Sequence, residues 1–147
     1  MTDTDRPALT YWHVWTDDEG TSRQSRATLT GFEQQSMGGD ADPQWNNRLM
    51  NGAVQILFSE LPQGWTGEWH ENPTPQWIIP LSGAWWVETM DGQRVEMGPG
   101  DLSFGADQGT TGSKGHRSGT VGDAPCRMMI VQLGERWTAA RPGELES

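Results

Sequence analysis

The chain has 147 residues, a formal net charge of −10 and a pI near 4.5. This acidic balance argues against a nucleic-acid partner and against an anionic membrane surface, because both require basic patches. Cys126 is the single cysteine, which excludes an intramolecular disulfide, and its apolar surroundings predict a buried, unreactive thiol. Without an apolar signal core near residue 1 or a stretch long enough to cross a bilayer, the sequence predicts a cytoplasmic protein.

Nineteen glycines and nine prolines punctuate the chain, while nine tryptophans are too many for a disordered polymer. Short strands joined by tight turns explain the many glycines and prolines, and an aromatic-rich interior explains the many tryptophans. Residues 9–140 are predicted to form one domain between two flexible tails, residues 1–8 and 141–147. A short helical segment is expected near the C-terminus.

The first predicted strand covers residues 11–16 (YWHVWT), which are aromatic and β-prone and precede the turn at residues 17–20. Residues 23–30 are expected to return as its antiparallel partner. The Gly, Asp, Pro and Asn content of residues 37–47 predicts a loop. A further strand is predicted over residues 53–61 (AVQILFSEL).

Residues 77–90 form a long extended run that we expect to bend at Gly83. Asp91-Gly92 is a strong hairpin signal between this run and residues 93–97. The chain is therefore predicted to reverse direction at this dipeptide.

The turn at residues 97–101 leads to a predicted strand over residues 102–106, and a Gly/Thr-rich loop follows. His116 then opens another extended stretch, and residues 126–133 (CRMMIVQL) close the fold. Nowhere do apolar residues keep a helical period over many turns. About eight to ten short strands at close spacing predict an all-β sandwich or barrel.

From Gly64 the sequence reads GWTGEWHENPTPQWIIPLSG, which resembles the first motif of the cupin superfamily. That motif has Gly, five residues, His, one residue, His, three or four residues, Glu, six residues and Gly. Gly64, His70, Gln76 and Gly83 fall at the family's spacings. Two identities differ, because Asn72 occupies the position of the second His and Gln76 that of the Glu.

Gly100-Asp101 and His116 resemble the ends of the second cupin motif. The intervening LSFGADQGTTGSKG is longer than usual, and Thr120 replaces the usual Asn. The resemblance covers residues 54–133, over half the chain, and is similar to that of small bacterial cupins. It implies an all-β fold, the antiparallel jelly-roll β-barrel.

His70, Asn72 and Gln76 are all even-numbered, so an extended chain directs their side chains to one face. A neighbouring strand can bring His116 to the same face. In cupins the matching positions bind a divalent transition metal, commonly Fe, Mn, Ni or Zn. The resemblance therefore implies His70, Asn72, Gln76 and His116 as metal ligands. Uncharged amides bind a cation less strongly than the usual residues, so Gln76→Glu is expected to tighten metal binding.

The leading functional interpretation is a metal-dependent dioxygenase, isomerase or lyase that acts on a small, partly apolar and possibly anionic metabolite. His70 and His116 are its candidate catalytic residues. The alternative is a metal-free cupin that binds a small ligand or transfers protons with one of these histidines as the base. Ile78 and Pro80 share the ligand face and are expected to form an apolar pocket floor.

Two groups of charged residues near these motifs are open to a functional and to a structural interpretation. Lys114 and Arg117 flank His116 and either attract an anionic substrate or are ordinary exposed loop charges. Asp107 and Glu71 are candidate general bases that nothing in the sequence positions.

Several aromatic residues also have two interpretations. His13 is either a structural histidine or part of the pocket. Trp69 and Trp77 are odd-numbered, which predicts that they point away from the pocket into a sheet–sheet core or a dimer contact, whereas the adjacent Trp85 and Trp86 must point in opposite directions. We expect a homodimer built partly from residues 11–15.

Overall fold

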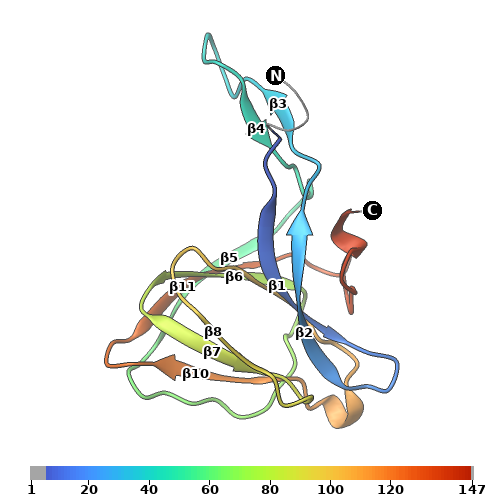
Figure 1. Ribbon diagram of the computed structural model, residues 1–147, viewed down its shortest axis with the longest axis vertical. Coiled ribbons are helices and arrows are strands. Elements are labelled where there is room, and N and C mark those ends of the chain that lie inside the picture. The colour runs from blue at the N-terminus through green and yellow to red at the C-terminus, as the bar shows by residue number, and fades with distance from the viewer. Residues whose placement is uncertain (1–5, 147) are drawn as a thin grey trace.

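The computed structural model describes residues 6–146, so residues 1–5 of the expected N-terminal tail and residue 147 lie outside the described part. Two facing β-sheets make the body, and a two-stranded pair extends from it (Figure 1). The larger sheet has the order β2-β1-β9-β6-β11-β5, with bounds β1 Leu9–Thr16, β2 Ser22–Leu29, β5 Gln55–Leu61, β6 Gln76–Ser82, β9 Ser103–Ala106 and β11 Cys126–Gln132. The smaller sheet has the order β10-β7-β8, with bounds β7 Ala84–Glu88, β8 Arg94–Met97 and β10 Arg117–Val121.

The first two strands form the predicted antiparallel pair. Oδ1 of Asp17 accepts hydrogen bonds from the backbone N–H groups of Glu19 and Thr21, which fixes the turn between them. The described pairs of the large sheet are antiparallel except for β1 and β9, which run parallel. A parallel pair requires a long crossover connection between its strands, and β1 and β9 are far enough apart in sequence to provide one. The all-β class predicted from the sequence is confirmed.

The chain passes from the large sheet to the small one at Gly83, the predicted bend between β6 and β7. Gly83 has φ of +75°, and a Cβ there would lie 2.2 Å from the carbonyl oxygen of Pro125. Only glycine fits such a position. The predicted reversal at Asp91-Gly92 is also confirmed, since Gly92 (φ +87°) donates its N–H to the carbonyl of Thr89 and joins β7 to β8.

One hydrophobic cluster fills the space between the two sheets. Strand alternation directs Ile78 of β6 and Met128 of β11 into this space. Residues of the small sheet meet them from the other side, so that the cluster consists of Val14, Ile78, Trp85, Val87, Val95, Met97, Cys126 and Met128. Cys126 is buried, as predicted, and burial raises the pKa of its thiol.

A second cluster covers the other side of the large sheet, where the C-terminal segment packs against it. Tyr11, Trp77 and Phe104 meet Trp137 and Leu145 there. Leu145 is 6 % exposed, although the sequence predicts a flexible tail at this position. The apolar side chain is enough to fix it against the sheet. The expected helical segment is the short 3-10 turn η3 (Glu144–Glu146).

Residues 37–47 are not entirely a loop. Strand β3 (Glu33–Gln35) pairs with β4 (Gln44–Asn46), so the predicted loop includes a short strand. The Gly, Asp and Pro residues form the tip, while Trp45 lies in the paired part. A further 3-10 turn, η2 (Thr111–Ser113), lies in the Gly/Thr-rich loop. In the described part of the chain no helix has the length and hydrophobicity needed to span a bilayer.

Candidate functional site

A cavity of about 130 Å³ lies between the two sheets. It brings together five of the residues predicted for the site, namely His70, Asn72, Gln76, Ile78 and His116. Pro80 is buried but is not among the residues that line the cavity; it pairs with Met128 next to the register shift between β6 and β11. The remaining lining residues are Ser59, Leu61, Trp65, Trp85, Ser118, Met128 and Ile130.

The two histidines lie side by side although 46 positions separate them in the sequence. Their backbones form a bridge in which each N–H donates to the carbonyl of the other, at 2.8 Å and 3.0 Å. Their ring centroids are 4.9 Å apart. His116 is buried and His70 is exposed, so the cavity meets solvent on the His70 side.

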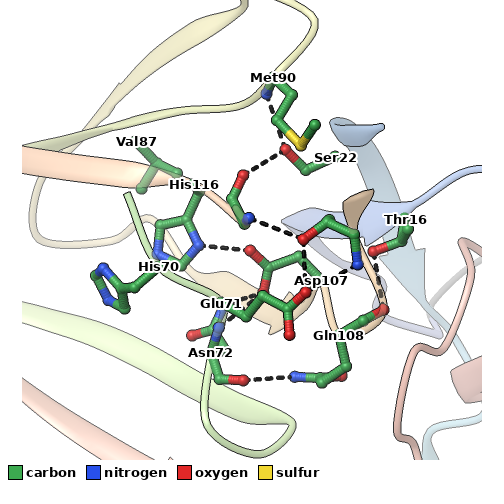
Figure 2. A network of polar contacts seen from close by, with 12 residues as sticks. Thr16, Ser22, His70, Glu71, Asn72, Val87, Met90, Asp107, Gln108 and His116 are labelled. Atoms are coloured by element: carbon green, nitrogen blue, oxygen red, sulfur yellow. Dashed lines mark hydrogen bonds and ion pairs between the residues drawn. The ribbon is translucent and has the colours of Figure 1, made fainter. Parts of the chain in front are cut away.

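A buried carboxylate holds one of the imidazoles (Figure 2). Oδ2 of Asp107 lies 2.6 Å from Nδ1 of His116, and Oδ1 accepts hydrogen bonds from the backbone N–H and the side-chain amide of Asn72 at 2.9 Å and 2.8 Å. Burial raises the pKa of Asp107, but the hydrogen bond and electrostatic interaction with His116 and the hydrogen bonds from Asn72 outweigh it and lower that pKa below the usual value. Asp107 is therefore ionised at neutral pH and can only accept hydrogen bonds.

The ionised carboxylate fixes the orientation of a chain of three amides. Asn72 must turn its NH₂ group toward Asp107, which turns its Oδ1 toward Gln76. Nε2 of Gln76 donates to that oxygen at 2.7 Å, and Oε1 of Gln76 in turn accepts from Nε2 of Gln132 at 2.9 Å. Flipping any one amide would set two acceptors or two donors against each other.

Two glycines make room for this arrangement. A Cβ on Gly105, which pairs with Gln76 in the sheet, would lie 2.3 Å from Nδ2 of Asn72. Gly115 has φ of +66°, and a Cβ there would lie 2.2 Å from the carbonyl oxygen of His70. The backbone therefore approaches closely on both sides of the site, as glycine permits.

The four predicted metal ligands do not fit a metal site as a set. His70 donates Nδ1–H to the carbonyl of Glu68 at 2.8 Å, so both imidazoles present Nε2 as a free acceptor. The oxygens of Asn72 and Gln76, however, already accept hydrogen bonds from neighbouring amides. Two imidazoles remain, whereas protein metal sites generally use three or four ligands. Among the described residues no group of three or more His, Cys, Asp or Glu side chains is arranged to hold an ion.

The charged residues near the motifs lie outside the cavity. The ammonium of Lys114 lies 4.4 Å from the ring centroid of Trp69, and Arg117 pairs with Glu88 at 3.0 Å. Glu71 is not among the residues that line the cavity, and its Oε2 accepts hydrogen bonds from the backbone N–H and the hydroxyl of Thr110 at 2.8 Å and 2.5 Å. It anchors the loop before His116.

The aromatic residues follow the predicted alternation. Trp77 lies with Tyr11 and Phe104 in the second hydrophobic cluster, on the side of the large sheet that faces away from the cavity, and Trp85 lines the cavity. His13 is a structural histidine, since it is fully buried and its Nε2 lies 2.7 Å from the carbonyl oxygen of Ala140. Burial lowers the pKa of His13 to about 4.

Sequence reasoning named Asp107 only as a candidate base without a partner, and it missed Gln132 and the aromatic wall of the cavity. Asp107 is visible only as one acidic residue in a loop, and nothing in its neighbourhood indicates that it meets His116. Gln132 lies in an apolar strand, where a polar side chain on the inward face is the one signal that could have marked it. The aromatic wall formed by Trp65 and Trp85 depends on the packing of the two sheets.

The match to a family model agrees with the fold. The family model for the Cupin domain matches residues 57–132, more than half of the chain. Protein NMB1881 from Neisseria meningitidis, known from a crystal structure, is 16% identical with a TM-score of 0.43, and the match covers 58% of this chain and 78% of that one. The search of curated proteins finds no significant match. On the match over residues 57–132, the chain belongs to the cupin family.

Proposed function

We propose that this cupin binds a small, uncharged and partly apolar molecule in the cavity and transfers a proton to or from it without a metal. The buried pair of Asp107 and His116 carries this proposal. A carboxylate that accepts from Nδ1 fixes the tautomer of an imidazole, leaves Nε2 as the base and stabilises the imidazolium that forms. The cavity places this nitrogen beside His70.

The size and lining of the cavity support the class of ligand. A cavity of about 150 Å³ holds benzene, so 130 Å³ fits a ligand of about six non-hydrogen atoms. Apolar side chains such as Ile78, Met128 and Ile130 form one part of the wall. No lysine or arginine is among the described lining residues, which favours an uncharged ligand over the anionic one expected from the sequence.

The proposed step is an isomerisation through an enol or enolate. Nε2 of His116 removes a proton from a carbon next to a carbonyl group, and the electron pair of that bond moves toward the carbonyl oxygen. His116 becomes an imidazolium held by ionised Asp107. Returning the proton to a different atom completes the isomerisation. Nε2 of His70 is placed at the mouth of the cavity, where it can accept a hydrogen bond from a hydroxyl group of the substrate.

Metal-dependent catalysis is the second candidate, and the orientation of the two imidazoles is compatible with it. Histidines that bind a metal through Nε2 also donate Nδ1–H to a carboxylate or carbonyl, as His116 and His70 do. The orientation therefore suits a base and a metal ligand equally. The amide oxygens distinguish the two functions, because the metal site would need them and the hydrogen-bond chain uses them.

Hydrogen–deuterium exchange at carbon tests the proposal. Cyclopentanone is an uncharged, enolisable probe of suitable size, and pyruvate is its anionic counterpart. In D₂O, NMR should show that the wild type accelerates exchange at the carbon next to the carbonyl. The acceleration should be greater for cyclopentanone than for pyruvate. His116→Gln should remove the acceleration. Equal acceleration by wild type and His116→Gln would contradict the role of this histidine.

A further inference from the structure

One hydrogen-bond donor in the wall of the cavity has no partner in the protein. The indole of Trp85 lines the cavity and is 3 % exposed, and its Nε1–H is buried without an acceptor in the described part of the chain. Nδ1 of His13 and Oε1 of Gln24 also lack a partner there, but these two residues do not line the cavity. A buried donor of this kind is uncommon, because burial removes its hydrogen bonds to water.

Trp85 is held firmly by the small sheet. It lies in β7, the central strand, where it pairs with Met97 of β8 and with Thr120 of β10. Its side chain belongs to the hydrophobic cluster between the sheets, together with Ile78 and Met128 of the large sheet. A side chain packed in this way keeps its polar atom in one position, as recognition of a ligand requires.

The other polar groups of the cavity leave this donor to a ligand. The oxygens of Asn72 and Gln76 already accept hydrogen bonds from neighbouring amides. Neither imidazole accepts from the indole, so Nε2 of His70 and of His116 remain free as well. An indole N–H can donate but cannot accept, so the ligand that pairs with it must carry an acceptor such as a carbonyl oxygen.

We propose that Nε1–H of Trp85 donates a hydrogen bond to the carbonyl oxygen of the substrate and stabilises the negative charge that forms on it. The assignment rests on the proposed function, in which Nε2 of His116 removes a proton from the neighbouring carbon. The electron pair of the broken C–H bond forms a C=C bond, and the pair of the carbonyl π bond moves to the oxygen. The proton stays on His116, and the indole keeps its own proton. A fixed donor shielded from water binds this oxygen more tightly as its charge grows.

NMR of the isotope-labelled full chain tests the contact directly. The chain has nine tryptophans, and the indole signal that is lost in Trp85→Phe belongs to Trp85. Cyclopentanone should move this signal downfield, as a new hydrogen bond does. Methylenecyclopentane has nearly the same shape but no acceptor oxygen, so it should not. A Trp85 signal that stays in place while other signals report binding of cyclopentanone would overturn the proposal.

Affinities for the same two ligands separate the hydrogen bond from the shape of the cavity. Trp85→Phe should weaken the binding of cyclopentanone about two- to tenfold more than that of methylenecyclopentane. Retained binding of the hydrocarbon shows that the variant has folded. Trp86→Phe is the matched control, because Trp86 does not line the cavity and stacks under the guanidinium of Arg94, 3.8 Å from its ring centroid. Equal losses for both ligands in Trp85→Phe would show that only the shape had changed and would overturn the proposal.

Exchange at carbon distinguishes this assignment from the proposed function. Trp85→Phe should slow the exchange of cyclopentanone about 10²–10³-fold, as the loss of one donor to a developing oxyanion does. His116→Gln should abolish the accelerated exchange and keep the downfield shift of the Trp85 signal. Exchange as fast in Trp85→Phe as in the wild type would reject the role of Trp85 while leaving that of His116. A shifted Trp85 signal in a wild type that does not accelerate exchange would support the contact and refute the proton transfer.

Discussion

Asp107 lies 2.6 Å from His116 and is shielded from solvent, while its second oxygen is held by both N–H donors of Asn72. One ionised carboxylate thus orients an imidazole on one side and a row of amides on the other. Asn72 and Gln76 replace the usual cupin ligands, and in this position they support Asp107 instead of presenting oxygens to the cavity. This arrangement is the basis for the proposed role of His116 as a base.

Replacing Asp107 by Asn should impair proton transfer far more than binding. The amide would present NH₂ to Nδ1 of His116, because its oxygen is needed by Asn72, and the imidazole would move its proton to Nε2. Carboxylate-to-amide exchange in a catalytic triad costs about 10⁴ in kcat, and we expect a loss of about 10³–10⁴ here with little change in KM. Kinetics of exchange at carbon measure this.

Glu88→Gln is the matched control for that variant. Glu88 is a carboxylate outside the cavity that pairs with Arg94 and Arg117. Its neutralisation should leave the exchange rate within about twofold, since such partly exposed pairs contribute little. A similar loss of rate in both variants would show that the effect of Asp107→Asn is not specific.

Gly105→Ala should disrupt the site through packing. The added Cβ would meet the amide of Asn72, which is held between Asp107 and Gln76 and cannot move freely. We expect a loss of about 1–3 kcal/mol in the free energy of unfolding and a reduced exchange rate. Gly98→Ala is the control, since its Cβ would meet only ordinary contacts at 3.6 Å or more. Equal denaturation midpoints for the two variants would contradict the tight fit at Gly105.

Glu71→Gln separates loop anchoring from catalysis. The amide oxygen can still accept one of the hydrogen bonds from Thr110, so the free energy of unfolding should fall by only about 1 kcal/mol. The exchange rate should stay within about threefold of the wild type, because Glu71 does not line the cavity. A loss of rate by orders of magnitude would mean that Glu71 takes part in the chemistry.

His13 should make the protein less stable in mild acid. Its pKa is about 4 in the folded chain and 6.5 in the unfolded chain, so only the unfolded chain binds a proton as the pH falls from 6.5 toward 4. The contribution of neutral His13 to the free energy of unfolding is full above pH 6.5 and should fall by about 3 kcal/mol by pH 4. His13→Gln, whose amide can still donate to the carbonyl of Ala140, should lack this part of the pH dependence in denaturant titrations. An unchanged pH dependence in the variant would contradict a neutral, buried His13.

The sequence predicts the fold and the convergence of the site because both depend on short-range patterns. Alternation along β6 places Gln76 and Ile78 on one face, an isolated bridge to His116 places His70, and glycine chemistry places the corner at Gly83. Alternation does not predict that Asn72 and Gln76 bind each other, since their further partners are distant in sequence: Gln132 lies in β11, and Asp107 follows β9. The pairing of β6 with β11 and with β9 brings Gln132 and the segment after β9 to them.

Two other differences have similar causes. Pro80 has the parity of the ligand face, but it lies next to the register shift between β6 and β11 and does not line the cavity. Leu145 lies beyond the last strand, where nothing in the sequence shows the surface against which it packs. Both depend on the path of the chain in three dimensions.

Metal analysis of the untagged wild-type protein tests the central claim most directly. The protein is incubated with iron, manganese, nickel and zinc in turn and then dialysed against metal-free buffer. Because two free imidazoles are too few for a tight site, each sample should retain less than about 0.1 metal per chain. Retention of about one metal per chain in the wild type, lost in His70→Ala and in His116→Ala, would contradict the metal-free site and establish the metal-dependent alternative.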